Sequence, residues 1–180
     1  MTRTPHLLDV PVLRQATGYE CGNTALAAVM QFLGEPRTPA ELATLAGTTP
    51  DGTDHANLVD AARATGASVT AKEDGTLDEI AAFVVRGLPV IVGWWPLGAD
   101  DEDWHPGWSL AERRARDCGH FSVIHGITAT GVVLMDPDVG TYELTFQAFD
   151  RAWYDTDTEH YVKVTRWYLV LDYAGNPLSS

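Results

Sequence analysis

The chain has 180 residues, of which 45% are hydrophobic and 21% are charged, and its formal net charge is -13. This length and composition suit a single globular domain over residues 1–180, with a core large enough to fold without disulfide bonds. The acidic balance repels phosphate groups, so we expect no nucleic-acid partner, and a neutral or basic peptide is the partner that this charge favours.

The N-terminal residues lack the apolar stretch of a signal peptide, and no run of residues is long and apolar enough to insert into a membrane. The 2 cysteines cannot form a disulfide scaffold. We therefore expect a cytoplasmic protein.

Helical patterns dominate the first half of the chain and strand patterns the second half. Helices are expected over residues 23–33, 38–47, 55–65, 76–86 and 146–154. Strands are expected over residues 7–13, 68–72, 90–94, 121–127, 132–135, 141–145 and 161–172. Thr38 with Glu41 and Thr76 with Glu79 are typical of capping boxes, which begin helices, and Pro11 confines the first strand to an edge. The order predicts an α+β fold, with an N-terminal helical half packed on a largely antiparallel C-terminal sheet.

Residues 95–118 interrupt this order and are interpreted as an inserted flap, and residues 175–180 as a frayed tail. The acidic run over residues 100–103 lies in the flap. It lacks the alternating ligands and the glycine of a calcium-binding EF-hand loop, so we interpret it as a solvated loop.

Cys21 is a candidate nucleophile because it lies where a loop becomes a helix. A thiol at a helix N-terminus faces unpaired backbone N–H groups and the positive end of the helix dipole, and both favour the thiolate. Gln15 precedes Cys21 with five residues between them. Its amide could donate a hydrogen bond to a developing oxyanion, as acyl transfer requires.

A cysteine nucleophile needs a histidine base and a group that orients the histidine. His120 begins one apolar run, and Asp136 ends the next. If the two runs pair as antiparallel strands joined by a turn over residues 128–131, His120 lies near Asp136. Gln15, Cys21, His120 and Asp136 then form one candidate catalytic set.

These residues resemble a known family. The elements Gln15-(five residues)-Cys21-Gly22, Gly119-His120-Phe121, and Asp136-Pro137 followed by Gly140 are similar to those of the bacteriocin-processing, or double-glycine-leader, cysteine peptidases of papain-like fold. The resemblance covers roughly residues 10 to 150 and implies a stand-alone peptidase-like domain. It implies that Gln15 is the oxyanion-hole amide, Cys21 the nucleophile, His120 the general base and acid, and Asp136 the residue that orients the imidazole.

Several neighbouring residues allow other interpretations. Cys118, two positions before His120, is either a buried thiol or a partner that inactivates Cys21 by forming a disulfide. Zinc bound by Cys21, Cys118 and His120 is disfavoured because the pair of closely spaced ligands is missing. We expect no cofactor and no metal. His125 falls on the strand face opposite His120 and is interpreted as structural, and Asn23 either orients its neighbours or caps the helix.

The expected function is cleavage of a peptide or protein substrate through a thioester, after a Gly-Gly-type pair of small residues in a leader peptide, as the resemblance implies. Two alternatives are a non-catalytic peptide-binding module of the same fold and an acyltransferase or amidase that uses the same Cys-His-Asp set. The sequence leaves open whether a separate export or modification partner exists.

Overall fold

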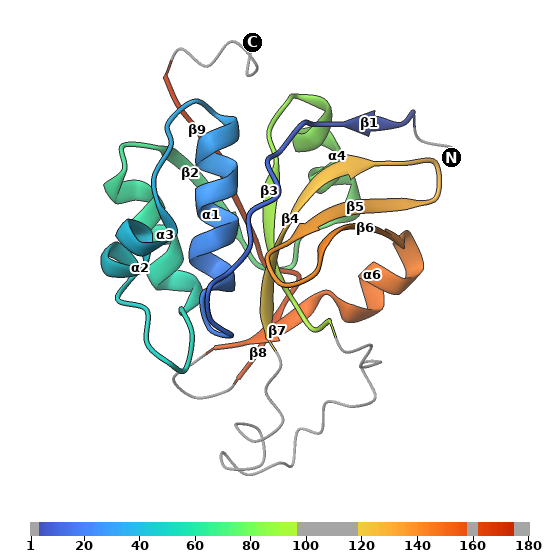
Figure 1. Cartoon of the computed structure of the whole chain (residues 1–180). Coiled ribbons are helices and arrows are strands. Elements are labelled where there is room, and N and C mark those ends of the chain that lie inside the picture. Colours follow the sequence, from blue (N-terminus) through green and yellow to red (C-terminus); the bar gives the residue numbers. More distant parts are fainter. Residues whose placement is uncertain (1–3, 97–118, 158–161, 175–180) are drawn as a thin grey trace.

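The computed structural model (Figure 1) describes residues 4–96, 119–157 and 162–174, so most of the expected flap and the whole expected tail lie outside the described residues. Its main sheet is seven-stranded in the order β2-β9-β3-β4-β5-β6, with β1 also paired to β4. The strands are β1 (His6–Leu7), β2 (Ser68–Lys72), β3 (Val90–Trp94), β4 (His120–Ile127), β5 (Gly131–Asp136), β6 (Gly140–Thr145) and β9 (Tyr168–Asp172). All of their pairings are antiparallel.

A smaller sheet and five helices complete the described part of the fold. The small sheet pairs β7 (Tyr154–Thr156) with β8 (Lys163–Thr165). The helices are α1 (Cys21–Phe32), α2 (Pro39–Ala46), α3 (His55–Ala64), α4 (Leu77–Val85) and α6 (Phe146–Ala152). Figure 1 shows α1, α2 and α3 grouped on one side of the sheet. The predicted α+β class with an antiparallel sheet is confirmed.

Capping residues define the starts of two helices as predicted. Thr38 and Glu41 form a complete capping box at α2, and Thr76 and Glu79 form one at α4. Each box satisfies backbone N–H groups that the first turn of a helix leaves unpaired. Helix α2 ends at Gly47, whose φ of 60° is the left-handed conformation that glycine adopts without strain.

The predicted start of the first helix is wrong by two residues. Helix α1 begins at Cys21, and its N-cap residue Glu20 makes no side-chain cap hydrogen bond. Asn23 therefore caps nothing: it is buried inside the helix, and its Nδ2 donates to Oγ1 of Thr48 at 2.8 Å. The side chain of Asn23 ties α1 to the loop before α3.

Two predicted strands and one helix are shorter than expected. The first strand is limited to β1: the backbone N–H of Leu8 still donates to the carbonyl of His125 on β4 at 2.8 Å, but residues 8–13 are not in a strand. The last strand is broken by Arg166, whose φ of 49° separates β8 from β9 and sends them to different sheets. Helix α6 ends at Ala152, because the next residues continue into β7.

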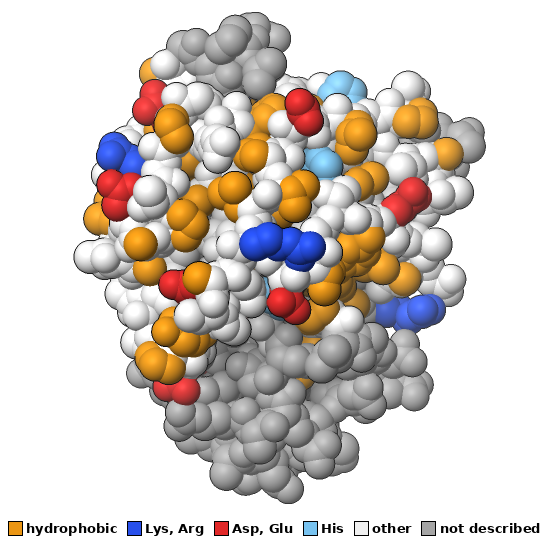
Figure 2. Space-filling model, viewed as in Figure 1, with side chains coloured by type: hydrophobic (Ala, Val, Ile, Leu, Met, Phe, Trp, Pro, Cys, Tyr) orange, Lys and Arg blue, Asp and Glu red, His pale blue; other side chains and the backbone are white. Residues whose placement is uncertain are grey.

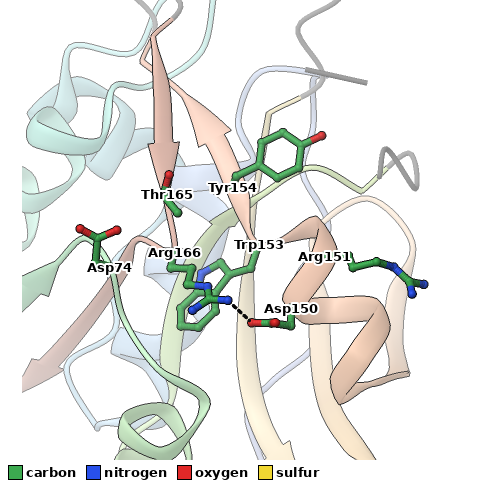
Figure 3. A pocket seen from close by; sticks show the side chains of 7 residues that line it. All are labelled: Asp74, Asp150, Arg151, Trp153, Tyr154, Thr165 and Arg166. Carbon is green, nitrogen blue, oxygen red and sulfur yellow. Dashed lines mark ion pairs between the residues drawn. The ribbon is translucent and has the colours of Figure 1, made fainter. Parts of the chain in front are cut away.

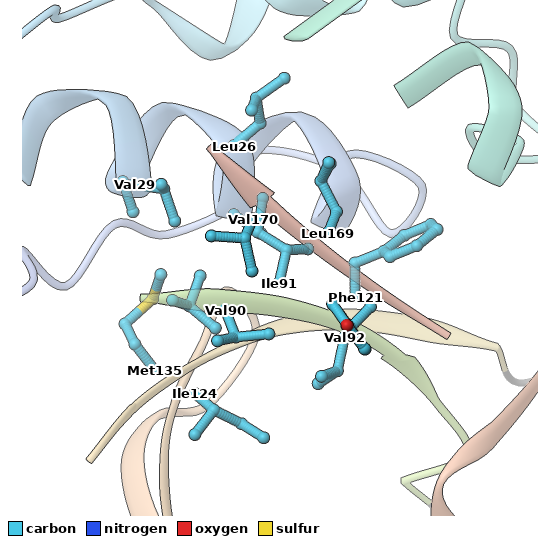
Figure 4. Packing of buried hydrophobic residues seen from close by; sticks show 14 of the residues in the cluster. Leu26, Val29, Val90, Ile91, Val92, Phe121, Ile124, Met135, Leu169 and Val170 are labelled. Carbon is cyan, nitrogen blue, oxygen red and sulfur yellow. The ribbon is translucent and has the colours of Figure 1, made fainter. Parts of the chain in front are cut away.

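The core lies between α1 and the sheet. Leu26 and Val29 of α1 are fully buried, and Val29 points toward the strands of the sheet (Figure 4). Burying one such side chain contributes about 1.5–3 kcal/mol. The small side chains of α1, Ala25, Ala27 and Ala28, are also fully buried and let the helix approach its neighbours closely. The packing fixes the position of Cys21 at the end of this helix.

A β-bulge interrupts the pairing of β4 with β5. Val123 pairs with Met135 and Ile124 with Leu134, but the register then shifts so that Gly126 pairs with Val133. His125 is the extra residue, and its Nδ1 donates to the carbonyl of Leu8 at 2.8 Å. The structural interpretation of His125 agrees with this contact.

Candidate active site

Cys21 is the first residue of α1 and is 8% exposed. The next residue, Gly22, allows the end of the helix to lie against β4: a Cβ added to Gly22 would come within 3.1 Å of Cδ2 of Phe121. Phe121 follows His120 in the chain, so the same close approach brings the thiol of Cys21 toward the imidazole of His120.

His120 and Asp136 lie on adjacent antiparallel strands, as expected. Nε2 of His120 is 3.0 Å from Oδ1 of Asp136, and both residues are largely buried. The side chain of Cys21 also acts on His120, because it contributes to the raised pKa of the imidazole. Because Nε2 faces the carboxylate, Nδ1 is the ring nitrogen left for the thiol. Cys21 and Asp136 thus both influence the imidazole of His120.

The charged forms of His120 and Asp136 stabilise each other. Burial by itself lowers the pKa of His120, but hydrogen bonds to Asp136 and Cys21 outweigh it and raise the pKa from 6.5 to about 10. Burial likewise raises the pKa of Asp136, but the hydrogen bond and positive charge of His120, with two backbone N–H groups, lower it to about 2. At neutral pH the pair is therefore an imidazolium and a carboxylate.

A backbone hydrogen bond anchors Gln15 next to Asp136. Its N–H donates to the carbonyl of Pro137, the residue after Asp136, at 3.0 Å. Oε1 of Gln15 is buried and has no hydrogen-bond partner among the described residues. The structure brings Gln15 to the turn that follows Asp136, and the role of its amide at an oxyanion stays a prediction.

Two hydroxyl groups that the sequence did not single out also reach Asp136. Oγ of Ser122 lies 3.1 Å and the hydroxyl of Tyr142 lies 3.2 Å from Oδ2. Ser122 could have been found from the sequence, because it lies two residues after His120 on a strand and so shares its face. Tyr142 comes from β6, and no local pattern links it to Asp136.

A second buried histidine and carboxylate lie close to this site. Nε2 of His55 is 3.2 Å from Oδ2 of Asp155, and the ring of His55 makes edge-on contacts with Phe121 and Trp167. His55 and Trp167 also line a groove of about 430 Å³ beside α3 and β8. The sequence analysis did not single out either residue of this pair.

A smaller cavity of about 170 Å³ lies between α6 and the small sheet (Figure 3). Arg166 and Asp150 form an ion pair of 2.9 Å across it. None of the four predicted site residues lines this cavity or the groove beside α3.

The described residues contain no group of three or more His, Cys, Asp or Glu side chains that could hold a metal ion. Cys118 and the acidic run of residues 100–103 lie outside the described part of the chain. Among residues 4–96, 119–157 and 162–174, no helix has the length and hydropathy needed to span a bilayer. On the face drawn in Figure 2, acidic, basic and hydrophobic side chains are interspersed.

Comparison with other sequences identifies relatives. The sequence profile of the Peptidase C39-like family matches residues 7–161. An uncharacterised protein of Methanothermobacter thermautotrophicus is 45% identical over 143 residues, which cover 79% of this chain and 82% of that protein. One of Methanothermobacter marburgensis is 29% identical over 143 residues, with the same two coverages of 79% and 82%.

Solved structures share the fold at lower identity. A C39-like protein of Bacillus anthracis has a TM-score of 0.71 at 18% identity and covers 96% of this chain and 99% of its own. A double glycine motif protease from an AMS/PCAT transporter, solved in complex with its leader peptide, has a TM-score of 0.66 at 20% identity, with 97% of each chain covered. Together with the profile match, these similarities show that the chain belongs to the Peptidase C39-like family and has the fold of the double-glycine peptidase domains.

Proposed function

We propose that this protein is a cysteine peptidase that cleaves a peptide bond through a thioester on Cys21. The observation that carries the proposal is the pair of His120 and Asp136, 3.0 Å apart, with Cys21 at the start of α1 contributing to the raised pKa of His120, which is about 10. A thiol beside a persistent imidazolium can lose its proton and attack a carbonyl, and the imidazolium can supply a proton to a leaving group.

In the first half of the reaction, the Cys21 sulfur attacks the carbonyl carbon of the scissile bond. The negative charge on the carbonyl oxygen is stabilised by the amide of Gln15 and by the backbone N–H of Cys21. The tetrahedral intermediate collapses as the C–N bond breaks, and His120 gives its proton to the departing amine. A thioester on Cys21 and a neutral imidazole remain.

In the second half, His120 accepts a proton from water, which attacks the thioester carbonyl. The C–S bond breaks, the carboxylic acid product leaves, and the sulfur and imidazolium return to their starting state. Asp136 keeps Nε2 of His120 protonated throughout, so that Nδ1 is the atom that exchanges the proton.

The finer part of the proposal concerns the substrate, which we infer to be a leader peptide cut after a Gly-Gly-type pair. It is supported by the family membership and by the similarity of the fold to a double glycine motif protease that binds a leader peptide.

The test is mass spectrometry of synthetic peptides that carry one Gly-Gly pair, incubated with the wild type and with Cys21→Ala. We expect two products cut after the pair, an acyl adduct on Cys21 of the wild type, and neither in the variant. A matched peptide with Val-Val in place of Gly-Gly should remain intact. Binding of the peptide without an adduct or products would contradict the peptidase and favour the peptide-binding module, and adducts formed only with non-peptide amides would favour the amidase.

Gln15→Ala separates the role of the oxyanion from that of the thiol. Loss of one oxyanion donor lowers kcat by about 10²–10³-fold. Alkylation of Cys21 by iodoacetamide forms no oxyanion, so its rate should stay unchanged in this variant. Equal losses of turnover and alkylation would contradict the assigned role of Gln15.

A further inference from the structure

Asp136 accepts hydrogen bonds on both carboxylate oxygens from the residues around it. Oδ1 accepts from Nε2 of His120 at 3.0 Å and from the backbone N–H groups of Asp138 and Val139 at 2.8 Å and 3.2 Å. Oδ2 accepts from Ser122 at 3.1 Å and from Tyr142 at 3.2 Å. The oxygen that faces His120 is thus distinct from the one that the two hydroxyls hold.

The strand pairing places Ser122 next to the carboxylate. Val123 pairs with Met135 in the β4–β5 ladder. One step further along the same register, Ser122 lies opposite Asp136, and residues directly opposite in antiparallel strands share a face. The hydroxyl of Ser122 therefore reaches the carboxylate without a long or flexible side chain.

A neighbouring indole determines the direction of the hydrogen bond from Ser122. Nε1 of Trp94 donates to Oγ of Ser122 at 3.0 Å, and all three residues in this path are buried. An indole N–H can only donate, so it occupies a lone pair of Oγ and leaves the single O–H of Ser122 for Asp136. Ser122 thus acts as a donor to the carboxylate.

Tyr142 is a donor as well. Burial raises the pKa of its hydroxyl, and the negative charge and hydrogen bond of Asp136 raise it further. The hydroxyl is therefore protonated at neutral pH, so it donates to Oδ2.

We propose that Ser122 and Tyr142 are positioning residues of the site: their hydroxyl groups hold the carboxylate of Asp136 ionised and turned so that Oδ1 meets His120. The consequence for turnover rests on the proposed peptidase function, whereas the consequence for the carboxylate does not. Neither residue touches the thiol, so both act through Asp136.

The charged groups around Asp136 are identified by their contacts. His120 faces it from β4, and Tyr142 is the titratable group of β6 that contacts it, while Glu143 of the same strand bonds Thr128 and Thr130 instead. Arg14, from the segment before α1, donates from its guanidinium to the carbonyl of Asp138. Substitutions that remove only the two hydroxyls leave these charges in place.

The experiment follows the ¹³C carboxylate signal of Asp136 against pH in the wild type, Ser122→Ala, Tyr142→Phe and the double variant. Removing hydrogen bonds to the charged form raises a carboxylate pKa. From the wild-type value of about 2, we expect the midpoint to rise by about one pH unit or more in the double variant. The matched control is Tyr173→Phe, which removes a tyrosine hydroxyl bonded to Thr65 instead.

A second measurement compares free energies of unfolding at pH 6 and pH 3. A depressed carboxylate pKa stabilises the folded state above the unfolded pKa of 3.8 and ceases to do so as pH falls through the folded value of about 2. The stability gap between the wild type and the double variant should therefore narrow at pH 3, whereas a purely structural loss, as in Tyr173→Phe, keeps the same gap.

An unchanged Asp136 midpoint together with a gap that does not depend on pH would overturn the proposal. Both measurements need no substrate, so their outcome is independent of whether peptides are cleaved. If peptides are cleaved, the double variant should also lower kcat with little change in KM, because the hydroxyls act on the base and not on bound peptide.

Discussion

The described part of the chain contains two buried histidine–aspartate pairs, which have similar separations but different surroundings. Nε2 lies 3.0 Å from a carboxylate oxygen in the His120–Asp136 pair and 3.2 Å in the His55–Asp155 pair. The first pair has a thiol on its other side and a network of donors behind the carboxylate. In the second pair, Nε2 makes no hydrogen bond despite the short distance, and Nδ1 has no partner among the described residues.

Aromatic rings replace polar partners around the second pair. The ring of His55 lies 4.9 Å from that of Phe121 and 4.7 Å from that of Trp167, both edge-on. Such contacts hold an imidazole by packing, whereas the donors around Asp136 fix a charge. A short His–Asp distance therefore does not by itself single out a candidate catalytic pair; the neighbouring thiol and the donors on the carboxylate distinguish His120 and Asp136 from His55 and Asp155.

The largest expected difference between the pairs is in chemistry. His120→Gln should lower peptide turnover by at least about 10⁴-fold, since the base and acid are lost. It should also slow iodoacetamide labelling of Cys21 at pH 6, because the positively charged partner that favours a thiolate is removed. His55→Gln should leave both rates close to those of the wild type. Equal losses of turnover and labelling in His120→Gln and His55→Gln would contradict the different roles assigned to the two pairs.

The second expected difference is in the dependence of stability on pH. The pKa of His120 is raised from 6.5 to about 10. Its contribution to the free energy of unfolding is therefore complete below about pH 6.5 and is lost as pH rises through about 10. Urea unfolding of the wild type and of His120→Gln should show a gap on the order of several kcal/mol at pH 6 that shrinks steadily towards pH 10. A gap that is constant over this range would contradict the charged state assigned to His120.

The smallest expected effect is a loss of stability on substitution of Gly93, whose backbone lies against His55 and Asp155. A Cβ on Gly93 of β3 would come within 2.6 Å of Nε2 of His55 and 2.8 Å of Oδ2 of Asp155. Gly93→Ala should therefore lower the free energy of unfolding by about 1–3 kcal/mol. Labelling of Cys21 should keep its rate.

The matched control for Gly93→Ala is Gly18→Ala, where an added Cβ meets nothing within 4 Å. Its effect on stability should stay within about 0.5 kcal/mol. A Gly93→Ala protein that is as stable as the wild type but labels slowly would show that the His55–Asp155 pair serves the chemistry after all.

The features predicted correctly from the sequence are those set by local patterns. The capping boxes of α2 and α4, the Gly47 stop and the strand carrying His120 all follow from residues close together in the chain. The pairing of β4 with β5 could be predicted too, since it needs only a short turn between two apolar runs. The roles of Gln15, Cys21, His120 and Asp136 in catalysis stay predictions.

Contacts between elements that no short turn connects could not be predicted. Tyr142 reaches Asp136 only because β6 pairs with β5. His55 meets Asp155 only because the start of α3 and strand β7 both pack next to Gly93 of β3. The break at Arg166 is a conformation that its residue type rarely adopts, so no propensity indicates it. Register and long-range neighbours come from packing of the whole chain.

The bulge at His125 bears on how the family can vary in length. A fully regular ladder continued from the pair of Gly126 with Val133 would place Val123 opposite Asp136 and turn His120 to the other face of the sheet. With the extra residue, Ser122 lies opposite Asp136 instead. A chain with one residue fewer in this strand would therefore reach the same arrangement without a bulge. Loss of this single residue would therefore keep the histidine and the aspartate facing each other, although one residue fewer would separate them in the sequence.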